Sequence, residues 1–386
     1  MRVLFLVYHG FSEHSGISKK IHYQVKGLCQ NGHEVYLCYY DRGDNGHWQR
    51  LIDNGDVLED FGSSKMAGLF QRICYGAIYN FCINHQIQMV YARCFQNANP
   101  WLVHLFGRLK KIGVKAVMEI PTYPYDREFE GFSHIERLQL SIDQMFRKRL
   151  AQQLEAIVTF TNQEQIFGQR TIRISNGVDL DSIPLHSPLS AASKSLHLIG
   201  VAEVHYWHGY DRLIAGLGKY YHNKSRILDV RCQKEVFFHI VGGVWKSEMY
   251  DDEHAPGFSE LIKKYGIEDK VIFHGQLFGE ELNAVFAQCS FAVGSLARHR
   301  CGINDIKTLK NREYASRGLP FMYSESDSDF DSQSYVLKVP ADETPIDVAN
   351  IVSFVEQLHM TPQEIRKTVE HLSWKVQMQR VVEDVL

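Results

Sequence analysis

The sequence predicts an α/β protein of two Rossmann-like domains, each built around a parallel β-sheet. Its 386 residues exceed the ~250 to 300 residues at which a single core stops growing. Short apolar runs alternate with helical patterns, an order typical of parallel sheets covered by helices on both faces. Midway, residues 181–195 are rich in Ser, Pro and Ala with little periodicity, which predicts a linker between the two domains.

The first half begins with a β-α-β unit, and the second half repeats the alternation after the linker. The strands expected in the first half are residues 3–8, 34–40, 89–94, 115–121 and 156–161, and those in the second are 196–202, 236–241, 271–273, 291–293 and 321–323. We expect one domain over 1–185 and the other over 195–360. Residues 361–386 have a helical pattern with Pro362 in the first turn, and should cap the second domain or cross back to the first.

Composition excludes several classes of protein. A formal net charge of -3 provides no general attraction to nucleic acid. Eight cysteines without a C-x-x-C spacing favour reduced, buried thiols over zinc or redox chemistry. The N-terminus lacks the features of a signal peptide, and no apolar stretch approaches the ~20 residues of a membrane span. We therefore expect a cytoplasmic protein.

The richest candidate for chemistry is the stretch 299–320, which follows a predicted strand and turns at Gly302. Ligands of open parallel sheets bind at the carboxyl ends of strands, where helix N-termini attract phosphate. We expect a helix here with Asp305 near its start and Glu313 on the same face, where carboxylates could accept sugar hydroxyls. The free amides around 303–308 would meet a diphosphate. The alternative is a solvated helix on which nearby Lys and Arg side chains pair with both carboxylates.

A second candidate is the loop after the first strand, which carries Gly10 and Gly16 and opens a helix. It matches neither the Walker A pattern nor G-x-G-x-x-G. The two glycines either form a turn or bring the backbone close to a bound phosphate or sugar.

Residues 313–320 resemble the E-A-x-A-x-G-x-P pattern of GT4-type retaining glycosyltransferases, matching it at the Glu, the Gly and the Pro. Residues 175–179 are similar to the N-G-V-D at the end of that family's first domain, and Glu34, which follows Asn31-Gly32-His33, lies in a segment that resembles its G-H-E-V. With domain order and length, the resemblance covers nearly the whole chain. It implies the GT-B fold, in which two Rossmann-like domains with parallel sheets face each other across a cleft.

The resemblance also implies roles for individual residues. Glu313 would bind the donor ribose, and Asp305, where the family usually has Glu, would contact the transferred sugar. Gly16 would approach the donor from the first domain. The remaining contacts would come from loops of the second domain. The amides of Thr308 and Leu309 would bind the distal phosphate, next to the diphosphate-binding segment Gly302, Ile303 and Asn304. The loop of Gly275, Gln276 and Leu277 would lie along the base.

The sequence departs from the family at its phosphate clamp. The pattern G-R-L-x-x-x-K-G appears as residues 202–209, with Glu203 in place of Arg and His208 in place of Lys. Since stabilisation of a leaving diphosphate is a large catalytic term, another cation must serve. The candidates are Lys310, Arg300 or a protonated His208.

A second departure concerns the acceptor side. The histidine that many relatives place after the fourth strand of the first domain is missing, and Glu119 stands in the loop that ends this strand. Glu119 could serve the acceptor as a catalytic carboxylate, or be a satisfied strand-end carboxylate.

The resemblance implies metal-independent, retaining transfer of a hexose from a UDP- or GDP-type sugar nucleotide to a saccharide or lipid-linked acceptor, by analogy in bacterial surface polysaccharide synthesis. No cofactor beyond this co-substrate is expected, and the D-x-D of residues 327–329 is a chance match. Basic residues Arg108, Lys110, Lys111 and Lys115 form a solvated face or rest against the inner face of a membrane. Two alternatives stay open: a nucleotide-sugar 2-epimerase, and a catalytically silent relative acting as a binding subunit.

Overall fold

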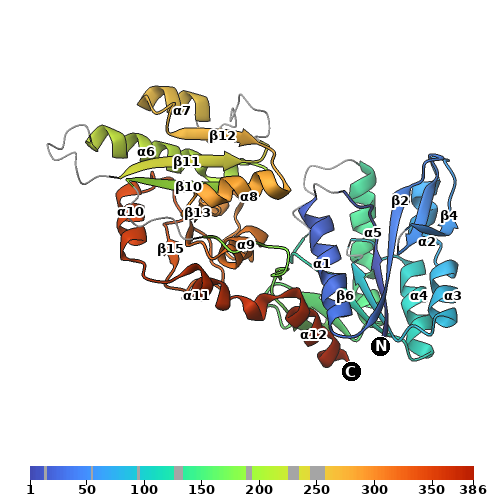
Figure 1. Cartoon of the computed structure of the whole chain (residues 1–386). Helices are drawn as coiled ribbons and strands as arrows, with labels where there is room; N and C mark the ends of the chain where they lie inside the picture. The colour runs from blue at the N-terminus through green and yellow to red at the C-terminus, as the bar shows by residue number, and fades with distance from the viewer. Residues whose placement is uncertain are drawn as a thin grey trace. The chain divides into compact units, whose positions relative to one another are not determined.

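The computed structural model describes residues 1–12, 15–53, 55–93, 96–125, 134–187, 194–224, 234–243 and 257–386. The chain divides into two compact units (Figure 1). Unit 1 comprises Met1–Gly177 together with Leu372–Leu386, and unit 2 comprises Val178–His371. Part of the predicted linker, residues 188–193, lies outside the described residues. The described part of the chain contains no helix long and apolar enough to cross a membrane.

Unit 1 is built on a sheet of nine described strands in the order β4-β3-β2-β1-β5-β6-β7-β9-β8. Its central strands are apolar and buried, as expected for parallel strands covered on both faces. The strands are β1 (Arg2–Val7), β2 (Glu34–Arg42), β3 (Trp48–Ile52), β4 (Asp56–Asp60), β5 (Met89–Arg93), β6 (Lys115–Ile120), β7 (Ala156–Thr159), β8 (Gln165–Ile166) and β9 (Gln169–Arg173).

The helices of unit 1 come from both ends of the chain. They are α1 (Gly16–Gln30), α2 (Ala67–Ile73), α3 (Gly76–Asn84), α4 (Pro100–Lys111), α5 (His134–Ala151) and α12 (Trp374–Val385). Helix α12, the C-terminal helix, packs beside α1 (Figure 1), and a Cβ on Gly27 would lie 2.7 Å from the backbone of Trp374. Only glycine allows α1 and α12 to approach this closely.

Unit 2 is built on a parallel sheet of six described strands in the order β12-β11-β10-β13-β14-β15. The strands are β10 (Ser195–Val201), β11 (Glu235–Val241), β12 (Val271–Gly275), β13 (Phe291–Val293), β14 (Phe321–Tyr323) and β15 (Val336–Lys338). The helices are α6 (Tyr210–Lys224), α7 (Phe258–Tyr265), α8 (Gly279–Gln288), α9 (Leu309–Arg317), α10 (Val348–Gln357) and α11 (Pro362–Lys367), with the short 3-10 turns η2 (Tyr206–His208) and η4 (Arg298–Cys301).

The predicted class of two α/β domains with parallel sheets is confirmed. The sequence did not reveal the antiparallel hairpin β3–β4, which extends the sheet of unit 1 beyond β2. Its first strand carries Gln49 and Arg50, both buried, and Arg50 donates to the hydroxyl of Tyr40 and the carbonyl oxygen of Cys74. Polar side chains that point inward hide the apolar alternation by which such a strand is recognised.

Candidate functional site

The carboxyl edge of the unit 2 sheet is formed by closely packed turns. The Ala202 amide donates to the carbonyl oxygen of Val241 at 2.9 Å, and the Gly242 amide donates to that of Gly275 at 2.7 Å. Gly242 has a φ of 125°, and a Cβ there would lie 1.8 Å from the carbonyl oxygen of Ala202. Only glycine can occupy this position, so the loops after β10, β11 and β12 are held together at one edge.

Helix α9 is fixed to the same edge by Tyr314. The buried hydroxyl of Tyr314 accepts from the Val201 amide at 3.1 Å and donates to the carbonyl oxygen of Val293 at 3.1 Å. These two groups stand at the ends of β10 and β13, so one side chain positions α9 against the central strands. The N-cap of α9 is Thr308, and its first turn contains no acidic residue. The first amides of such a helix lack intrahelical partners and favour an anion.

Enclosed polar side chains surround the start of α9. Buried polar atoms nearly always have a hydrogen-bond partner, yet several here have none among the described residues. They are Thr308 Oγ1, Lys310 Nζ, both amide atoms of Asn311, Ser324 Oγ and both carboxylate oxygens of Glu325. Asn311 is 0% and Glu325 2% exposed. A concentration of donors and acceptors at a helix N-terminus on the carboxyl edge of a parallel sheet has the character of a ligand-binding site.

Burial shifts the pKa values of two charged groups at this site, Lys310 and Glu325, towards the neutral forms. Burial, reinforced by Arg298 and opposed by Glu325, lowers the pKa of Lys310 to about 7. Burial likewise raises the pKa of Glu325 to about 7, against the effect of its own backbone amide, Arg298 and Lys310. Lys310 as a whole residue is half-buried, but its ammonium nitrogen is enclosed. Both groups therefore change protonation near neutral pH, where a nearby charge shifts their state.

Glu313 lies one to two turns into α9 and is held by Arg317. One oxygen, Oε1, accepts from Arg317 Nε at 3.0 Å and from Nη2 at 2.8 Å. Arg317 in turn donates to Asn283 Oδ1 at 2.9 Å. The Glu313 side chain is 35% exposed, so an oriented carboxylate is presented to solvent.

Asp305 does not lie on a helix, contrary to expectation. The helix begins only at Leu309, and the backbone around Asp305 pairs with Ser326 instead. The Ile306 amide donates to the Ser326 carbonyl oxygen at 3.0 Å, and the Ser326 amide donates to that of Asn304 at 2.7 Å. Residues 304–306 are extended because they use their backbone groups in this bridge. Asp305 and Glu313 are therefore not on one helix face.

The amides expected to meet a diphosphate are only partly available. Ile303 N donates to the Arg298 carbonyl oxygen at 3.2 Å, and Ile306 N is used in the bridge. Gly302, with a φ of 70°, closes the turn η4. The amides at the start of α9, from Leu309 onward, are those that fit an anion.

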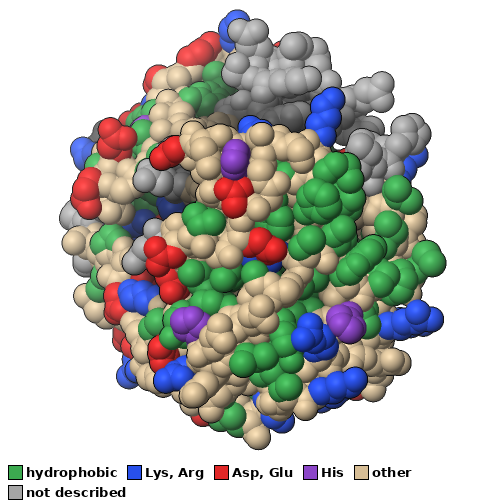
Figure 2. Space-filling model, turned by 90° about the vertical axis from the view of Figure 1, so that its right-hand side faces the viewer, with side chains coloured by type: hydrophobic (Ala, Val, Ile, Leu, Met, Phe, Trp, Pro, Cys, Tyr) green, Lys and Arg blue, Asp and Glu red, His purple; other side chains and the backbone are tan. Residues whose placement is uncertain are grey.

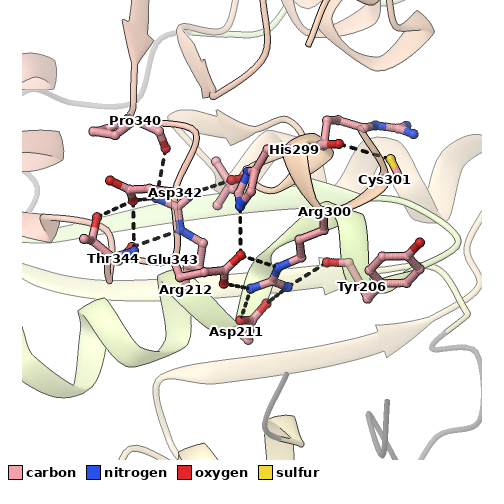
Figure 3. A network of polar contacts seen from close by, with 12 residues as sticks. Tyr206, Asp211, Arg212, His299, Arg300, Cys301, Pro340, Asp342, Glu343 and Thr344 are labelled. Atoms are coloured by element: carbon pink, nitrogen blue, oxygen red, sulfur yellow. Dashed lines mark hydrogen bonds and ion pairs between the residues drawn. The ribbon is translucent and has the colours of Figure 1, made fainter. Parts of the chain in front are cut away.

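Two of the three candidate cations are already engaged or neutral. The Arg300 guanidinium donates to both oxygens of Asp211 and contacts Glu343 (Figure 3), and its side chain is 6% exposed. Burial, with Lys310, Arg298 and His205 nearby, lowers the pKa of His208 well below its usual value. His208 is thus neutral at physiological pH, and Lys310 is the candidate whose nitrogen has no partner among the described residues.

The other predicted positions lie on loops. Gly275, with a φ of 69°, and Gln276 are exposed at the end of β12, and Leu277 follows them. Gly16 is the first residue of α1 in unit 1, behind the N-cap Ser15, and a Cβ there would meet nothing within 4 Å.

Glu119 is a buried member of β6 rather than a loop residue, and it is 0% exposed. Its carboxylate pairs with Lys20 at 3.2 Å and Arg93 at 3.1 Å, and it accepts from Tyr91 and Gln24 at 2.7 and 2.6 Å. Burial opposes its ionisation, but Lys20 and Arg93 lower its pKa to about 2. The structure supports the satisfied-carboxylate alternative, because a side chain so enclosed does not meet an acceptor.

The D-x-D at 327–329 is occupied by a structural ion pair. Arg312 donates to both oxygens of Asp327 at 2.6 and 3.0 Å and also contacts Asp329. Across the described residues there is no group of three or more His, Cys, Asp or Glu side chains that could hold a metal ion.

Three of the enclosed polar side chains around the start of α9 were not predicted from the sequence: Asn311, Ser324 and Glu325. A signal was present for two of them. Ser324 and Glu325 follow directly after the predicted strand 321–323, so the rule that ligands bind at carboxyl ends of strands applies to them. Asn311 had no such signal, because its position on α9 was indistinguishable from a solvated one.

Comparison with solved structures defines the fold as GT-B. The chain superimposes along 99% of its length on 98% of the sucrose-phosphate synthase from Thermosynechococcus elongatus, with a TM-score of 0.63 at 12% identity. It matches Anabaena HepE, solved in complex with UDP and glucose, over 99% of this chain and 98% of that one, with a TM-score of 0.56 at 14% identity.

The catalytic domain of starch synthase IV from Arabidopsis thaliana, bound to ADP and acarbose, gives a TM-score of 0.59 at 12% identity, covering 99% of this chain and 98% of that domain. No protein-family description matches the sequence. A search of curated proteins also finds no significant match. At these identities the likeness establishes the fold, and the function is argued from the site.

Proposed function

We propose that this chain is a glycosyltransferase whose unit 2 binds a nucleotide-diphosphate sugar at the start of α9. The observation that carries the proposal is the set of enclosed, unpartnered polar side chains there, above all Asn311 and Glu325. Such groups are costly to bury without a partner. A polar ligand that enters this site supplies the missing hydrogen bonds.

The parts of the site match the parts of a sugar nucleotide. The diphosphate accepts hydrogen bonds from the amides at the N-terminus of α9, which has no acidic residue in its first turn. The ribose hydroxyls donate to the carboxylate of Glu313. Among the hydrogen bonds of the described residues, Arg317 uses only Oε1 of this carboxylate, so Oε2 can accept from the ribose. Asp305 is exposed and contacts the transferred sugar, a role that rests on the resemblance to GT4-type enzymes.

The reaction is transfer of a hexose with retention of configuration and without a divalent ion. Retention follows from the same resemblance. Metal independence follows from the helix amides and a lysine ammonium, which can hold a diphosphate in place of a divalent metal ion. Solved structures of the same fold contain UDP in one case and ADP in another, so the base is left to experiment, with UDP and GDP as our first choices.

The acceptor is a saccharide or a lipid-linked saccharide, and unit 1 offers a surface for the membrane in the second case. On α5, Leu138 and Met145 are 62% and 70% exposed, and Lys148 and Arg149 follow on the same helix. Figure 2 shows hydrophobic side chains gathered on one face of unit 1, with lysine and arginine side chains near them. An apolar stripe beside basic residues suits an anionic membrane surface.

Thermal unfolding with UDP, GDP, ADP and dTDP and their common sugars tests the donor site. A ligand at ~100 times its dissociation constant stabilises the folded protein by ~2.7 kcal/mol, and this raises Tm by several degrees. The shift should be lost in Glu313→Ala. It should persist in Glu356→Ala, a control on α10 whose exposed carboxylate pairs with Lys234 just before β11, at the opposite end of the sheet.

The same panel separates the alternatives. Turnover of the stabilising sugar nucleotide without any acceptor would indicate a 2-epimerase. If no nucleotide shifts Tm, the donor site is refuted and a catalytically silent binding subunit becomes the better description. Binding to vesicles that contain phosphatidylglycerol, compared with Leu138→Gln/Met145→Gln, tests the membrane surface separately.

A further inference from the structure

Lys310 and Glu325 are opposite in charge and enclosed in the same site, yet they form no ion pair. Lys310 is the second residue of α9, and Glu325 follows β14. Each affects the pKa of the other, so they are electrostatic neighbours. Lys310 Nζ has no hydrogen-bond partner among the described residues, and the oxygens of Glu325 have none from any other described residue. A buried charge without a partner is normally avoided, so these atoms keep hydrogen-bonding capacity that a ligand could use.

The charged and titratable groups that face this pair come from four elements: η4, η2 with its N-cap residue, β15, and β14, where Tyr323 is influenced by Glu325. Arg298 of η4 acts on both side chains, and Lys310 influences His208 of η2 and His205, the N-cap residue of η2. Lys338 of β15 acts on Glu325 and donates to its backbone carbonyl oxygen. These neighbours are cationic or neutral, so an anion is the ligand that the surroundings favour.

We propose that Lys310 and Glu325 bind the donor's diphosphate together, Lys310 as an ammonium and Glu325 as a carboxylic acid, and that donor binding thereby takes up a proton. This inference rests on the proposed function. The proton comes from the solvent and no covalent bond changes. Lys310 takes the place of the clamp that Glu203 and His208 do not supply, and it does so from α9 instead of the loop after β10.

The chemistry of the two groups accounts for the proton. Near pH 7 the free protein has Lys310 partly deprotonated and Glu325 partly ionised, since the pKa of each is about 7. A diphosphate attracts the ammonium and repels the carboxylate, so it raises both pKa values. The bound state therefore carries more protons than the free state. By linkage, donor affinity is highest at low pH and falls as pH rises through about 7.

Calorimetric titration in buffers of different ionisation enthalpy measures this proton directly. UDP-glucose, ADP-glucose and GDP-mannose are suitable probes, because their phosphates do not titrate near neutrality. We expect net proton uptake at pH 7 with whichever probe binds. In Glu325→Gln, which mimics the protonated acid, binding persists with reduced uptake. In Lys310→Met the affinity falls about 10- to 100-fold, as expected for a lost charge-assisted hydrogen bond, whereas Lys310→Arg binds with a weaker dependence on pH.

The Tm of each variant without ligand shows whether a loss of binding results from misfolding. Lys310→Met removes an enclosed, unpartnered charge, so its Tm without ligand should equal or exceed that of the wild type. Lys270→Met, at the amino end of β12 where Lys270 pairs with Glu235 and Asp269, is the matched control and should leave binding unchanged.

The outcomes are distinguishable. If a probe binds the wild type with no proton uptake, or binds Lys310→Met equally well, this inference is overturned while the donor site stands. If no probe binds the wild type, the proposed function itself fails and the inference fails with it.

Discussion

Arg300 and Asp211 form a bidentate ion pair, in which two guanidinium nitrogens lie 3.0 and 2.8 Å from the two carboxylate oxygens. Arg300 also donates to the carbonyl oxygen of Tyr206 at 2.8 Å. The pair thus joins η4 to η2 and to the start of α6 (Figure 3). Its geometry assigns Arg300 to the support of the site, because its donors are already taken by protein oxygens.

Arg300→Met should therefore destabilise unit 2 without removing nucleotide binding. Removing one partner of a buried ion pair costs about 3 to 5 kcal/mol, since Asp211, which is 6% exposed in the wild type, would be left with an unpaired charge. Urea unfolding gives the loss of stability, and the nucleotide-induced Tm shift gives the binding. Glu343→Gln is the control: this carboxylate is 59% exposed and should contribute at most about 1 kcal/mol. Loss of the nucleotide shift in a folded Arg300→Met protein would contradict this assignment.

Glu119 provides a second prediction, in unit 1. Glu119→Gln leaves Lys20 and Arg93, 5% and 8% exposed, without their shared carboxylate. We expect a loss of about 3 to 5 kcal/mol in the free energy of unfolding. The pH dependence has a definite sign. The pKa of Glu119 is lowered from 4.5 to about 2, so its contribution is complete above pH 4.5 and is lost as pH falls towards 2.

Acid unfolding followed by circular dichroism checks this dependence. Between pH 4.5 and 2 the wild type should lose more stability than Glu119→Gln. Glu34→Gln, which removes the exposed partner of Arg2, should behave like the wild type. Equal acid sensitivity of wild type and Glu119→Gln would show that the carboxylate is not ionised in the folded protein.

Much of the fold was predictable because its signals are local. Runs such as Arg2–Val7 and Glu235–Val241 are apolar and bounded by turns, which is sufficient to recognise a buried parallel strand. The turn and helix around Gly302 were recognised for the same reason, but the start of the helix was placed too early. A backbone bridge between Asp305 and Ser326 joins segments whose pairing no local pattern reveals.

The side-chain environments were less predictable because they depend on distant partners. Glu119 was indistinguishable from an accessible strand-end carboxylate until Lys20 and Arg93 were seen beside it. Lys310 and Arg300 were equal candidates by charge. Only the tertiary structure shows that Arg300 meets Asp211 while the Lys310 nitrogen is enclosed near Glu325.

The C-terminal helix supplies a third prediction. Trp374 is 2% exposed, and a Cβ on Gly177 would lie 2.5 Å from its ring. Trp374→Ala should destabilise unit 1 by about 3 to 5 kcal/mol through the cavity it leaves. Hydrogen exchange should rise in peptides of α1 and the central strands of unit 1. Val376→Ala, on the same helix but 39% exposed, is the matched control. A protein unaffected by Trp374→Ala would show that α12 does not complete this core.

A row of three histidines in unit 2 leads to the last prediction. His197, His239 and His274 lie on the adjacent strands β10, β11 and β12, and each neighbouring pair of ring nitrogens is 2.9 Å apart. Each of these contacts holds one proton between two nitrogens, so two neighbouring rings of the row cannot both be protonated. Burial, with the two neighbouring histidines, lowers the pKa of His239 to about 4. Burial also lowers the pKa of His197 and of His274.

The sign follows from the direction of these shifts. Above pH 6.5 the rings are neutral in both folded and unfolded chains, and the row imposes no penalty. As pH falls from 6.5 towards 4, these histidines bind protons in the unfolded chain but not in the folded one. The free energy of unfolding of unit 2 therefore decreases. For His239 alone the loss approaches ~3 kcal/mol, the equivalent of the shift at 1.36 kcal/mol per pKa unit.

Hydrogen exchange of β10 to β12 peptides at pH 7.5 and 5 measures this loss, after correction for the intrinsic rates. His239→Gln can still donate and accept a hydrogen bond but does not titrate, so it should reduce the difference between the two pH values. His359→Gln, at an exposed histidine beyond α10, should leave it unchanged. If His239→Gln loses as much stability on acidification as the wild type, the histidine row is not the origin of the acid sensitivity of unit 2.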